Sequence, residues 1–480
     1  MRKFIFTLIF LQLINFSLKA QTLFTKTYGA LGEFNMSHSV AQSLDGNYLF
    51  LGSTGGWGAI NGDIALVKTD TLGNIIWTKL YGNDATEDGV SIRALNDNGA
   101  IFIGTSNDNS IGDYNIIVTR VDSLGEILWT KVLGSPSWDI AKEIIQLNDG
   151  GFAIASTTYE SPFESGTFDL MKIDSVGNLL WESRFPLGES NIVGGIDELE
   201  DGTILIGGQG IQSGHTDKDL LLVKYSSIGD TLWSRYYGGI EDEWITDIAH
   251  AFDQRICMVG NKTQAEGNTR DIVMVSNQDG NVLYINDIYS DRIVSLNSVS
   301  YSAIDSTFIS AGEFSNDVVT RATIYKWDLY GYYVCSAAMN PIATSHVGEA
   351  VTTNDSHILL TGTFNNIGPG IESFFLVKSE LNCFSNLSIT IGIEETNSNI
   401  ESSDTPFPNP TSGLFNINLS IEPELIELID LTGKNIPFTQ IYHAGTLSID
   451  AGSIAPGIYV LKLRSNQNSP SKYQSIIISR

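Results

Sequence analysis

Five aromatic or imidazole side chains stand in segments that are otherwise rich in Gly, Ser, Asn and Asp: Trp57, Tyr114, Tyr159, Phe163 and His215. A ring among small polar residues suits recognition of a sugar or a protein. The ring supplies rigid contact area, while its neighbours supply hydrogen bonds. The alternative is that these rings pack on their own strands. We therefore name the five as candidate ligand-binding residues for a glycan or a protein.

Acidic residues recur near the same segments, and they are Glu87-Asp88, Asp139 and Glu241-Asp242-Glu243. A ring of carboxylates could hold a cation or a basic partner; the alternative is a set of solvated loop acids. The formal net charge of −28 argues against nucleic acid as a partner, because a phosphate backbone would be repelled. No EF-hand loop is present, so calcium stays a weak alternative to the expectation of no cofactor.

Catalysis requires side chains that converge, and the sequence singles out none. The six histidines share no position in the repeat described below and no spacing typical of metal ligands. Neither a Gly-x-Ser-x-Gly motif nor a phosphate-binding loop occurs. We predict no catalytic residue and no metal ligand. An extracellular hydrolase or lyase acting on polysaccharide or protein is retained as an alternative.

These candidates lie within a repeat whose best copy spans residues 73–82 and is preceded by Asp70. The box Asp-x-x-Gly-x-x-x-Trp returns every 52 residues and then every 51, with its last residue at Trp77, Trp129, Trp181, Trp233, Tyr284 and Cys335. A fixed period near 50 residues indicates stacked supersecondary units.

Each repeat carries four strand patterns separated by turn residues. The first ends in an Asp-containing turn, at Asp45, Asp97, Asp149, Asp201, Asp253, Asp305 and Asp355, and the third contains Leu-Val-Lys or a close variant. The seventh copy lacks its fourth strand, but residues 22–29 match residues 75–82. We therefore predict an all-β fold, in which residues 21–384 form a seven-bladed β-propeller of four-stranded blades closed by the N-terminal strand.

The recurring Gly and Trp have structural interpretations: Gly allows the turn before the fourth strand, and Trp fills the wedge between blades. The box resembles that of the Trp-box propellers related to quinoprotein-like folds, over about 360 residues. This resemblance implies the fold and no particular activity. The adjacent Cys-Cys pair of the quinone dehydrogenases in that group is absent, so no quinone cofactor is expected.

The N-terminus is typical of a secretory signal peptide, predicted over residues 1–20, with Met1-Arg2-Lys3 before an apolar run. No later stretch is apolar enough for a transmembrane segment. Of the three cysteines, Cys257 lies in an apolar run and is expected to be a buried thiol. Cys335 and Cys383 could form a disulfide.

The composition changes after the repeats. Residues 385–405 are expected to be a linker, and residues 406–480 a small β-sandwich. Three motifs occur in this tail: Pro408-Asn409-Pro410-Thr411-Ser412-Gly413, a turn with Gly433, and a strand that begins at Gly457 and includes Tyr459. The tail resembles the type A C-terminal sorting domain of the type IX (Por) secretion system of Bacteroidetes. The resemblance implies the outer-membrane secretion machinery as a partner, and release or attachment outside the outer membrane.

The leading hypothesis from the sequence is a secreted or cell-surface propeller that acts as a binding or adhesion module. An extracellular enzyme and a purely structural surface protein are the alternatives.

Overall fold

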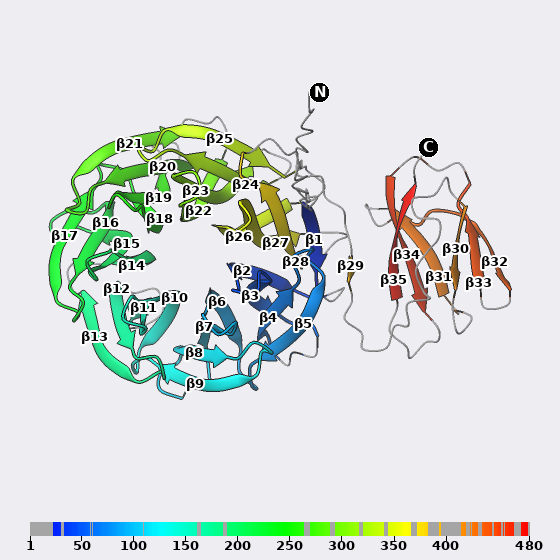
Figure 1. Ribbon diagram of the computed structural model, residues 1–480, viewed down its shortest axis with the longest axis horizontal. Coiled ribbons are helices and arrows are strands. Elements are labelled where there is room, and N and C mark those ends of the chain that lie inside the picture. The colour runs from blue at the N-terminus through cyan, green and yellow to red at the C-terminus, as the bar shows by residue number, and fades with distance from the viewer. Residues whose placement is uncertain are drawn as a thin grey trace, which may run out of the picture.

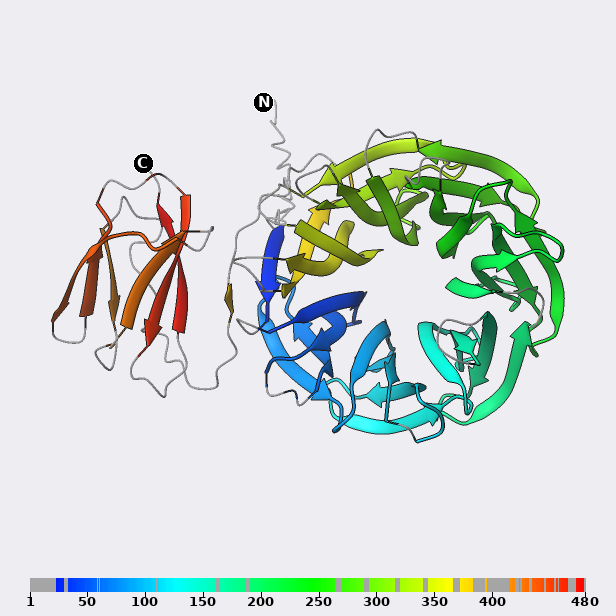
Figure 2. The same ribbon diagram turned by 180° about the vertical axis from the view of Figure 1, so that it is seen from behind.

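The computed structural model describes residues 23–29, 33–57, 59, 61–108, 110–160, 165–185, 190–263, 269–288, 293–315, 320–339, 344–365, 372–382 and 393–394, and then parts of 414–478. All regular elements in these residues are strands. Seven antiparallel sheets surround a central opening as the blades of a propeller (Figure 1 and, from behind, Figure 2). The predicted all-β, seven-bladed fold is confirmed.

In six blades the four strands follow one another in the chain and pair in that order. Blades 1 to 3 comprise β2 (Asn35–Gln42), β3 (Tyr48–Thr54), β4 (Asp63–Thr69), β5 (Ile75–Tyr81), β6 (Glu87–Ala94), β7 (Ala100–Ser106), β8 (Asn115–Val121), β9 (Ile127–Leu133), β10 (Trp138–Gln146), β11 (Phe152–Tyr159), β12 (Gly166–Ile173) and β13 (Leu179–Phe185). Blades 4 to 6 comprise β14 (Ile192–Glu198), β15 (Ile204–Ile211), β16 (Lys218–Tyr225), β17 (Thr231–Tyr237), β18 (Glu243–His250), β19 (Ile256–Thr263), β20 (Thr269–Ser276), β21 (Val282–Ile288), β22 (Ile293–Ser302), β23 (Thr307–Ser315), β24 (Thr320–Trp327) and β25 (Tyr333–Ala338).

The two ends of the propeller meet in blade 7. β26 (Thr344–Thr352), β27 (His357–Asn365) and β28 (Glu372–Glu380) receive β1 (Phe24–Tyr28) as their fourth strand, with Phe24 opposite Lys378. The predicted closure by the N-terminal strand is confirmed, and it covers the edge of β28 that would otherwise be exposed. The two-residue strand β29 (Ile393–Glu394), within the segment expected to be a linker, pairs in parallel with β1.

The aromatic residue of each box packs against the box glycine of the next blade. Gly125 has φ +78°, and a Cβ atom there would lie 3.1 Å from the Trp77 ring. The same contact recurs between Trp129 and Gly177 and between Trp181 and Gly229. Glycine is therefore needed both for the left-handed turn and for the room that the indole occupies. This agrees with the predicted role of Trp in the wedge between blades.

The turn Asp and the third-strand Lys, which recur in the repeat, are ion-pair partners. Lys68 Nζ lies 2.9 Å from Asp45 Oδ2, and its side chain is only 4% exposed. Equivalent pairs are Arg120–Asp97, Lys172–Asp149, Lys224–Asp201, Lys326–Asp305 and Lys378–Asp355. In blade 5, Val275 stands at the Lys position, opposite Tyr284, and Asp253 pairs with Arg255 at 3.3 Å instead. In the other six blades, the pair ties the turn between the first two strands to the third strand.

The C-terminal strands form two three-stranded sheets. One contains β30 (Leu414–Asn418), β33 (Thr446–Asp450) and β32 (Thr439–His443), and the other contains β31 (Leu425–Asp430), β34 (Gly457–Arg464) and β35 (Lys472–Ile478). Phe415 and Ile449 of the first sheet share one buried cluster with Leu428 and Leu461 of the second. The two sheets therefore pack face to face, as a β-sandwich requires.

Two further observations concern the cysteines and membrane helices. Cys257 is a free, buried thiol, as predicted, and burial raises its pKa. Cys335 is in a disulfide, and Cys383 lies outside the described residues. Within the described part of the chain, no helix is long and apolar enough to cross a membrane.

Candidate functional site: the central channel and the loop face

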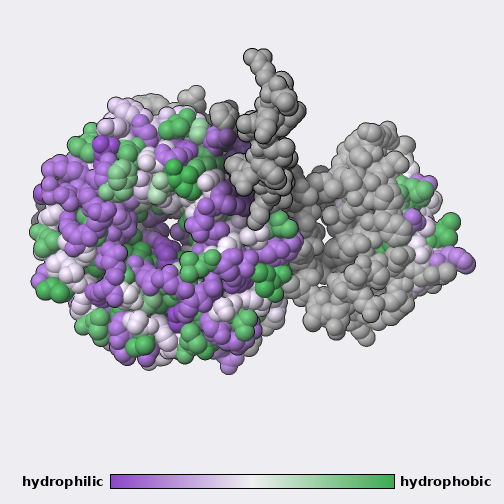
Figure 3. Space-filling view, in the orientation of Figure 1, coloured by the Kyte–Doolittle hydropathy of each residue, from purple (hydrophilic) through white to green (hydrophobic). Residues whose placement is uncertain are grey.

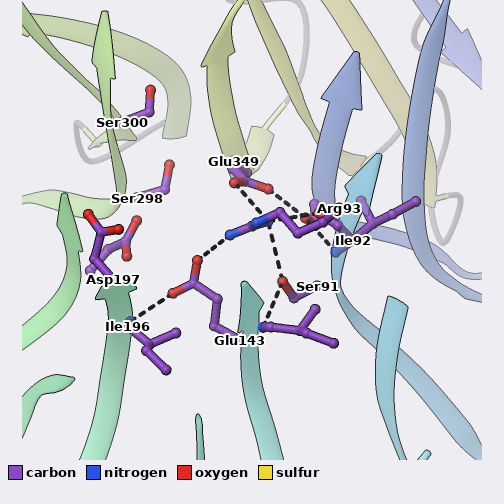
Figure 4. A network of polar contacts seen from close by, with 12 residues as sticks. Ser91, Ile92, Arg93, Glu143, Ile196, Asp197, Ser298, Ser300 and Glu349 are labelled. Atoms are coloured by element: carbon purple, nitrogen blue, oxygen red, sulfur yellow. Dashed lines mark hydrogen bonds and ion pairs between the residues drawn. The ribbon is translucent and has the colours of Figure 1, made fainter. Parts of the chain in front are cut away.

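The first strand of every blade lines the central opening, and one ion-pair network crosses it (Figure 4). Arg93 of β6 contacts Glu143 of β10 through Nη2. Its Nη1 lies 3.6 Å from Glu349 Oε1 of β26 and donates a hydrogen bond of 2.7 Å to the Ile92 carbonyl. One guanidinium therefore links blades 2, 3 and 7 across the channel. The hydropathy surface shows hydrophilic residues around this opening (Figure 3).

A ring of hydrogen bonds runs around the channel and joins each blade to the next. In every case a side-chain oxygen on one first strand accepts the backbone N–H of the next first strand, over 2.7 to 3.4 Å. The acceptor and donor residues are Ser39–Ile92, Ser91–Ile144, Glu143–Ile196, Asp197–His250, Asp247–Val299, Ser298–Ala350 and Glu349–Val40. The last of these bonds closes the ring between blades 7 and 1.

Each first strand contains a β-bulge next to the residues that form this ring. The register shifts between Gly89 and Ser91 in β6 and between Ala141 and Glu143 in β10, and comparable shifts occur in the other five first strands. A bulge inserts one unpaired residue and re-aims the side chains that follow it. The channel-facing acceptors follow from this local irregularity.

Two cavities of about 280 and 480 Å³ occupy the channel and share Glu143, Asp247 and Glu349 as lining residues. Burial raises the pKa of Glu143 to about 7, with Arg93 opposing the shift and Glu349 adding to it. Burial, with Glu143 nearby, also holds the pKa of Asp247 well above its ordinary value. The hydrogen bond to Asp197, 2.8 Å long, raises the pKa of His250 despite its burial. The two carboxyl groups with raised pKa values are thus the same ones that accept backbone hydrogen bonds of the ring.

The loop face carries the residues that sequence analysis named. Because the strands are antiparallel, the loops between second and third strands open on the same side as those leading into the first strands. Trp57, half-buried between β3 and β4, lies with its ring 5.6 Å from Phe374 of blade 7. Tyr159 ends β11, and burial raises its pKa. His215 is exposed before β16, and Phe163 lies outside the described residues.

Tyr114 is paired with a ring that sequence analysis did not list among the candidates. Its ring centroid lies 4.7 Å from that of Trp138, at an interplanar angle of 57°. Trp138 Nε1 donates a hydrogen bond of 3.0 Å to Asp113 Oδ2. Both rings are half-buried, and they join blades 2 and 3. This arrangement fixes two aromatic edges beside a carboxylate. The four described candidates, Trp57, Tyr114, Tyr159 and His215, are spread over blades 1 to 4.

Sequence analysis also missed the channel network. One column of the repeat, with a spacing of 52 residues or its multiple, contains Ser39, Ser91, Glu143 and Asp247. This recurrence of polar residues could have been recognised in the sequence. Arg93 has no such signal, because no other blade repeats it.

In the tail, Gly457 begins β34, as expected for the motif. Tyr459 is buried, and its hydroxyl donates to the Ala455 carbonyl over 2.8 Å. Pro408, Asn409, Pro410, Gly413 and Gly433 lie outside the described residues.

Comparison with known proteins found two kinds of likeness. Residues 405–479 match the family model of the secretion system C-terminal sorting domain. No curated protein matches the chain. Among solved structures, Sqt1 from Chaetomium thermophilum is 10% identical, with 75% of this chain and 98% of that chain covered and a TM-score of 0.42.

Two further structures are similar. The β-propeller domain of the Trilobed protease from Pyrococcus furiosus is 10% identical, over 74% of this chain and 99% of that one, with a TM-score of 0.46. The acylaminoacyl peptidase from Pyrococcus horikoshii is 9% identical, with a TM-score of 0.43. The match covers 69% of this chain and 49%, about half, of that chain. At such identities the likeness concerns the fold alone.

The sorting domain implies handling by the type IX secretion machinery and export. The chain is therefore a β-propeller that carries a type IX secretion system C-terminal sorting domain and is exported to the cell surface or secreted.

Proposed function

We propose that the propeller is a binding module that engages an extracellular glycan or protein through its loop face. The observation that carries this proposal is the Tyr114–Trp138 pair with Asp113. Its rings are half-buried, so part of each remains accessible, and the hydrogen bond from Trp138 to Asp113 fixes the indole. A pre-oriented aromatic side chain beside a carboxylate binds at a low entropic cost and can also accept hydrogen bonds from a ligand.

The engagement of the channel carboxylates also favours recognition at the loops. Glu143, Asp197, Asp247 and Glu349 each accept a backbone N–H of the next blade. Moving one of them toward a substrate would break an inter-blade bond. The channel therefore acts first as the scaffold, and loops on a rigid scaffold are where binding sites usually lie.

The test is binding of the full chain to arrays of glycans and extracellular proteins, with and without calcium. We expect selective binding that falls at least about tenfold in Trp138→Ala and Tyr114→Ala, because buried aromatic anchors dominate such interfaces. Tyr330→Ala is the matched control, since Tyr330 is 53% exposed and contacts Arg255 away from the loop face. Binding that is unchanged in the loop variants would refute the proposal.

An extracellular hydrolase or lyase is the second candidate. The elevated pKa values of Glu143 and Asp247, in a channel with open volume, favour it. Its test is turnover of polysaccharide and protein substrates by the full chain and by Glu143→Gln. Activity lost in that variant, with the fold intact, would favour an enzyme. A folded protein without binding or turnover would favour the structural alternative.

A further inference from the structure

A histidine and two aspartates converge at the junction of blades 4 and 5. His215, Asp217 and Asp219 alternate along the chain where the β15–β16 loop enters β16, and each offers a ligand atom within 4.8 Å of those of the other two. A tight turn presents the histidine: His215 N–H donates to the Gln212 carbonyl over 2.9 Å, and Gly214 has φ +87°. Glycine at the third position is what a type II turn requires.

The two aspartates lack counter-charges. Asp219 is 5% exposed, and Asp217 Oδ2 is shielded from solvent without a hydrogen-bond donor. Among the ion pairs of the described residues, none involves Asp217 or Asp219. Lys218 lies between them in sequence, but strand alternation directs its side chain to the opposite face. Burying carboxylates without hydrogen-bond donors or counter-ions costs free energy of folding, and a bound cation would offset that cost.

A fourth carboxylate stands behind Asp219. Glu243 is 2% exposed; its Oε1 lies 3.2 Å from Lys262 Nζ, while its buried Oε2 has no hydrogen-bond partner. A Cβ atom built on Gly238 would lie 2.0 Å from Asp219 Oδ1 and 2.7 Å from Glu243 Oε2. Both oxygens therefore meet over the same glycine. Glu243 is thus paired with Lys262 through one oxygen, while its other oxygen, the buried Oε2, lies beside Asp219 without a hydrogen-bond partner; this observation is independent of the His-Asp-Asp spacing.

We propose that His215, Asp217 and Asp219 bind a divalent transition-metal ion of the Zn²⁺ type, with Glu243 beside them. Imidazole nitrogen together with carboxylate oxygen is a donor set that zinc accepts, whereas Ca²⁺ and Mg²⁺ prefer oxygen alone. Ligand atoms around a tetrahedral zinc ion lie roughly 3.5 Å apart. The exposed His215 side chain can close the remaining gap, and the fourth position would hold water or Glu243.

Blade 1 contains the same scaffold without the extra ligands. Asp63 and Glu87 flank Gly82 as Asp219 and Glu243 flank Gly238. The turn is also repeated, because Ala59 N–H donates to the Gly56 carbonyl over 3.0 Å. At this copy, however, Ala59 and Asn61 stand where blade 4 has His215 and Asp217, 156 residues later. The metal site is therefore specific to blade 4, and blade 1 supplies a matched control.

The test is calorimetric titration of the untagged full chain with ZnCl₂, after treatment with a chelator and its removal. We expect one saturable site, a higher thermal unfolding temperature with zinc than without, and weaker binding of CaCl₂. His215→Ala should reduce zinc affinity at least about tenfold, a loss typical even for residues that only support a ligand. Because His215 is exposed, this variant should fold normally.

Glu87→Gln, in the copy of the scaffold in blade 1, is a control that should leave zinc affinity unchanged. The assignment would be overturned by the absence of saturable zinc binding to the folded chain, or by zinc binding that His215→Ala leaves unaltered. Equal affinities for calcium and zinc, in the wild type and in His215→Ala, would also overturn it, because the imidazole would then have no part in the site.

Discussion

Lys68 of the third strand and Asp45 of the first turn in blade 1 form a salt bridge of 2.9 Å in which the lysine side chain is 4% exposed and the aspartate 33%. Burial alone would raise the pKa of Asp45, but hydrogen bonds from Ser43 and Lys68 outweigh it and lower the pKa to about 2. The ammonium is thus the buried member, and among the described residues Asp45 supplies its counter-charge. The two members of the pair are not energetically equivalent.

We predict that Asp45→Asn destabilises the protein more than Lys68→Met does. The first substitution leaves a buried ammonium without its counter-charge and should cost about 2 kcal/mol in the free energy of unfolding. The second leaves an aspartate that water can reach, so its cost should be about 1 kcal/mol. Denaturant titration of both variants, monitored by tryptophan fluorescence, measures the two values. Equal losses would contradict the asymmetry.

The same pair predicts a dependence on pH. The folded-state pKa of Asp45, about 2, is below its ordinary value of 3.8, so its stabilising effect is complete above pH 3.8 and is lost as the pH falls toward 2. The difference between wild type and Asp45→Asn should therefore be constant from pH 7 to 5 and shrink below pH 4. A difference that persists at pH 2 would show that the carboxylate charge is not responsible.

Gly125 and Gly150 give a second, paired prediction. Both have positive φ, +78° and +85°, but a Cβ atom on Gly125 would lie 3.1 Å from Trp77 and 2.8 Å from Lys79, whereas nothing lies within 4 Å of one on Gly150. Gly150→Ala should cost about 1 kcal/mol from backbone strain alone. Gly125→Ala should cost about 2–3 kcal/mol, because it also displaces the indole.

Thermal or denaturant unfolding of the two variants provides the comparison. If Gly125→Ala were no worse than Gly150→Ala, the indole would not be packed against the glycine as described. The turn at Gly150 serves as the control because it shares the backbone conformation and lacks the neighbour.

The sequence predicted the propeller because its repeat carries the whole architecture. Trp77 and its successors return every 52 residues, and residues 22–29 supply the missing strand of blade 7. Period and strand count are local properties of the chain, so they can be read without coordinates. The recurring Asp at position 45 and the recurring Lys at position 68 could also be recognised in the sequence. That they form an ion pair follows only from the strand register.

The candidate sites were harder to predict because they depend on departures from the repeat. Arg93 occurs in one blade only, and its partners Glu143 and Glu349 come from strands 50 and 256 residues away in sequence. The Tyr114–Trp138 contact likewise joins loops of two blades. Such contacts depend on non-repeating side chains that the folded propeller brings together, and the period of the repeat does not show which of them meet.

Asp169 and Arg184 predict a compensating double substitution. They face each other in blade 3, where blades 1 and 2 have Ala65–Leu80 and Ile117–Val132. Asp169 is fully buried, and Arg184 Nε lies 3.3 Å from its Oδ2. Arg184→Leu should lower the free energy of unfolding by about 3 kcal/mol, since it leaves a buried carboxylate without its counter-charge. The double variant Asp169→Leu/Arg184→Leu should have a free energy of unfolding within about 1 kcal/mol of wild type.

A double-mutant cycle of unfolding free energies at pH 7 measures this coupling. Additive losses in the double variant would mean that the apolar pair of the neighbouring blades cannot be accommodated here. Restoration would mean that blade 3 keeps its ion pair for reasons other than stability.

Asp271 predicts a variant that is more stable than the natural protein. It lies in β20 with no exposed surface; its Oδ1 accepts the Leu296 N–H over 3.2 Å, and its Oδ2 has no partner among the described residues. Burial raises its pKa to about 7, against the weaker effect of that hydrogen bond. Because the folded-state pKa is above the ordinary value of 3.8, the folded state binds the extra proton between these values, and stability falls as the pH rises from 4 to 7.

Asp271→Asn removes this titration and keeps an oxygen to accept the Leu296 N–H. At pH 8 the variant should be more stable than wild type by on the order of 2–4 kcal/mol, since each pKa unit corresponds to about 1.4 kcal/mol. The advantage should vanish near pH 4, where the wild-type carboxyl is protonated in the folded state. Denaturant titrations of both proteins at pH 4, 6 and 8 provide the test. A constant difference across these pH values would mean that Asp271 does not carry the buried charge.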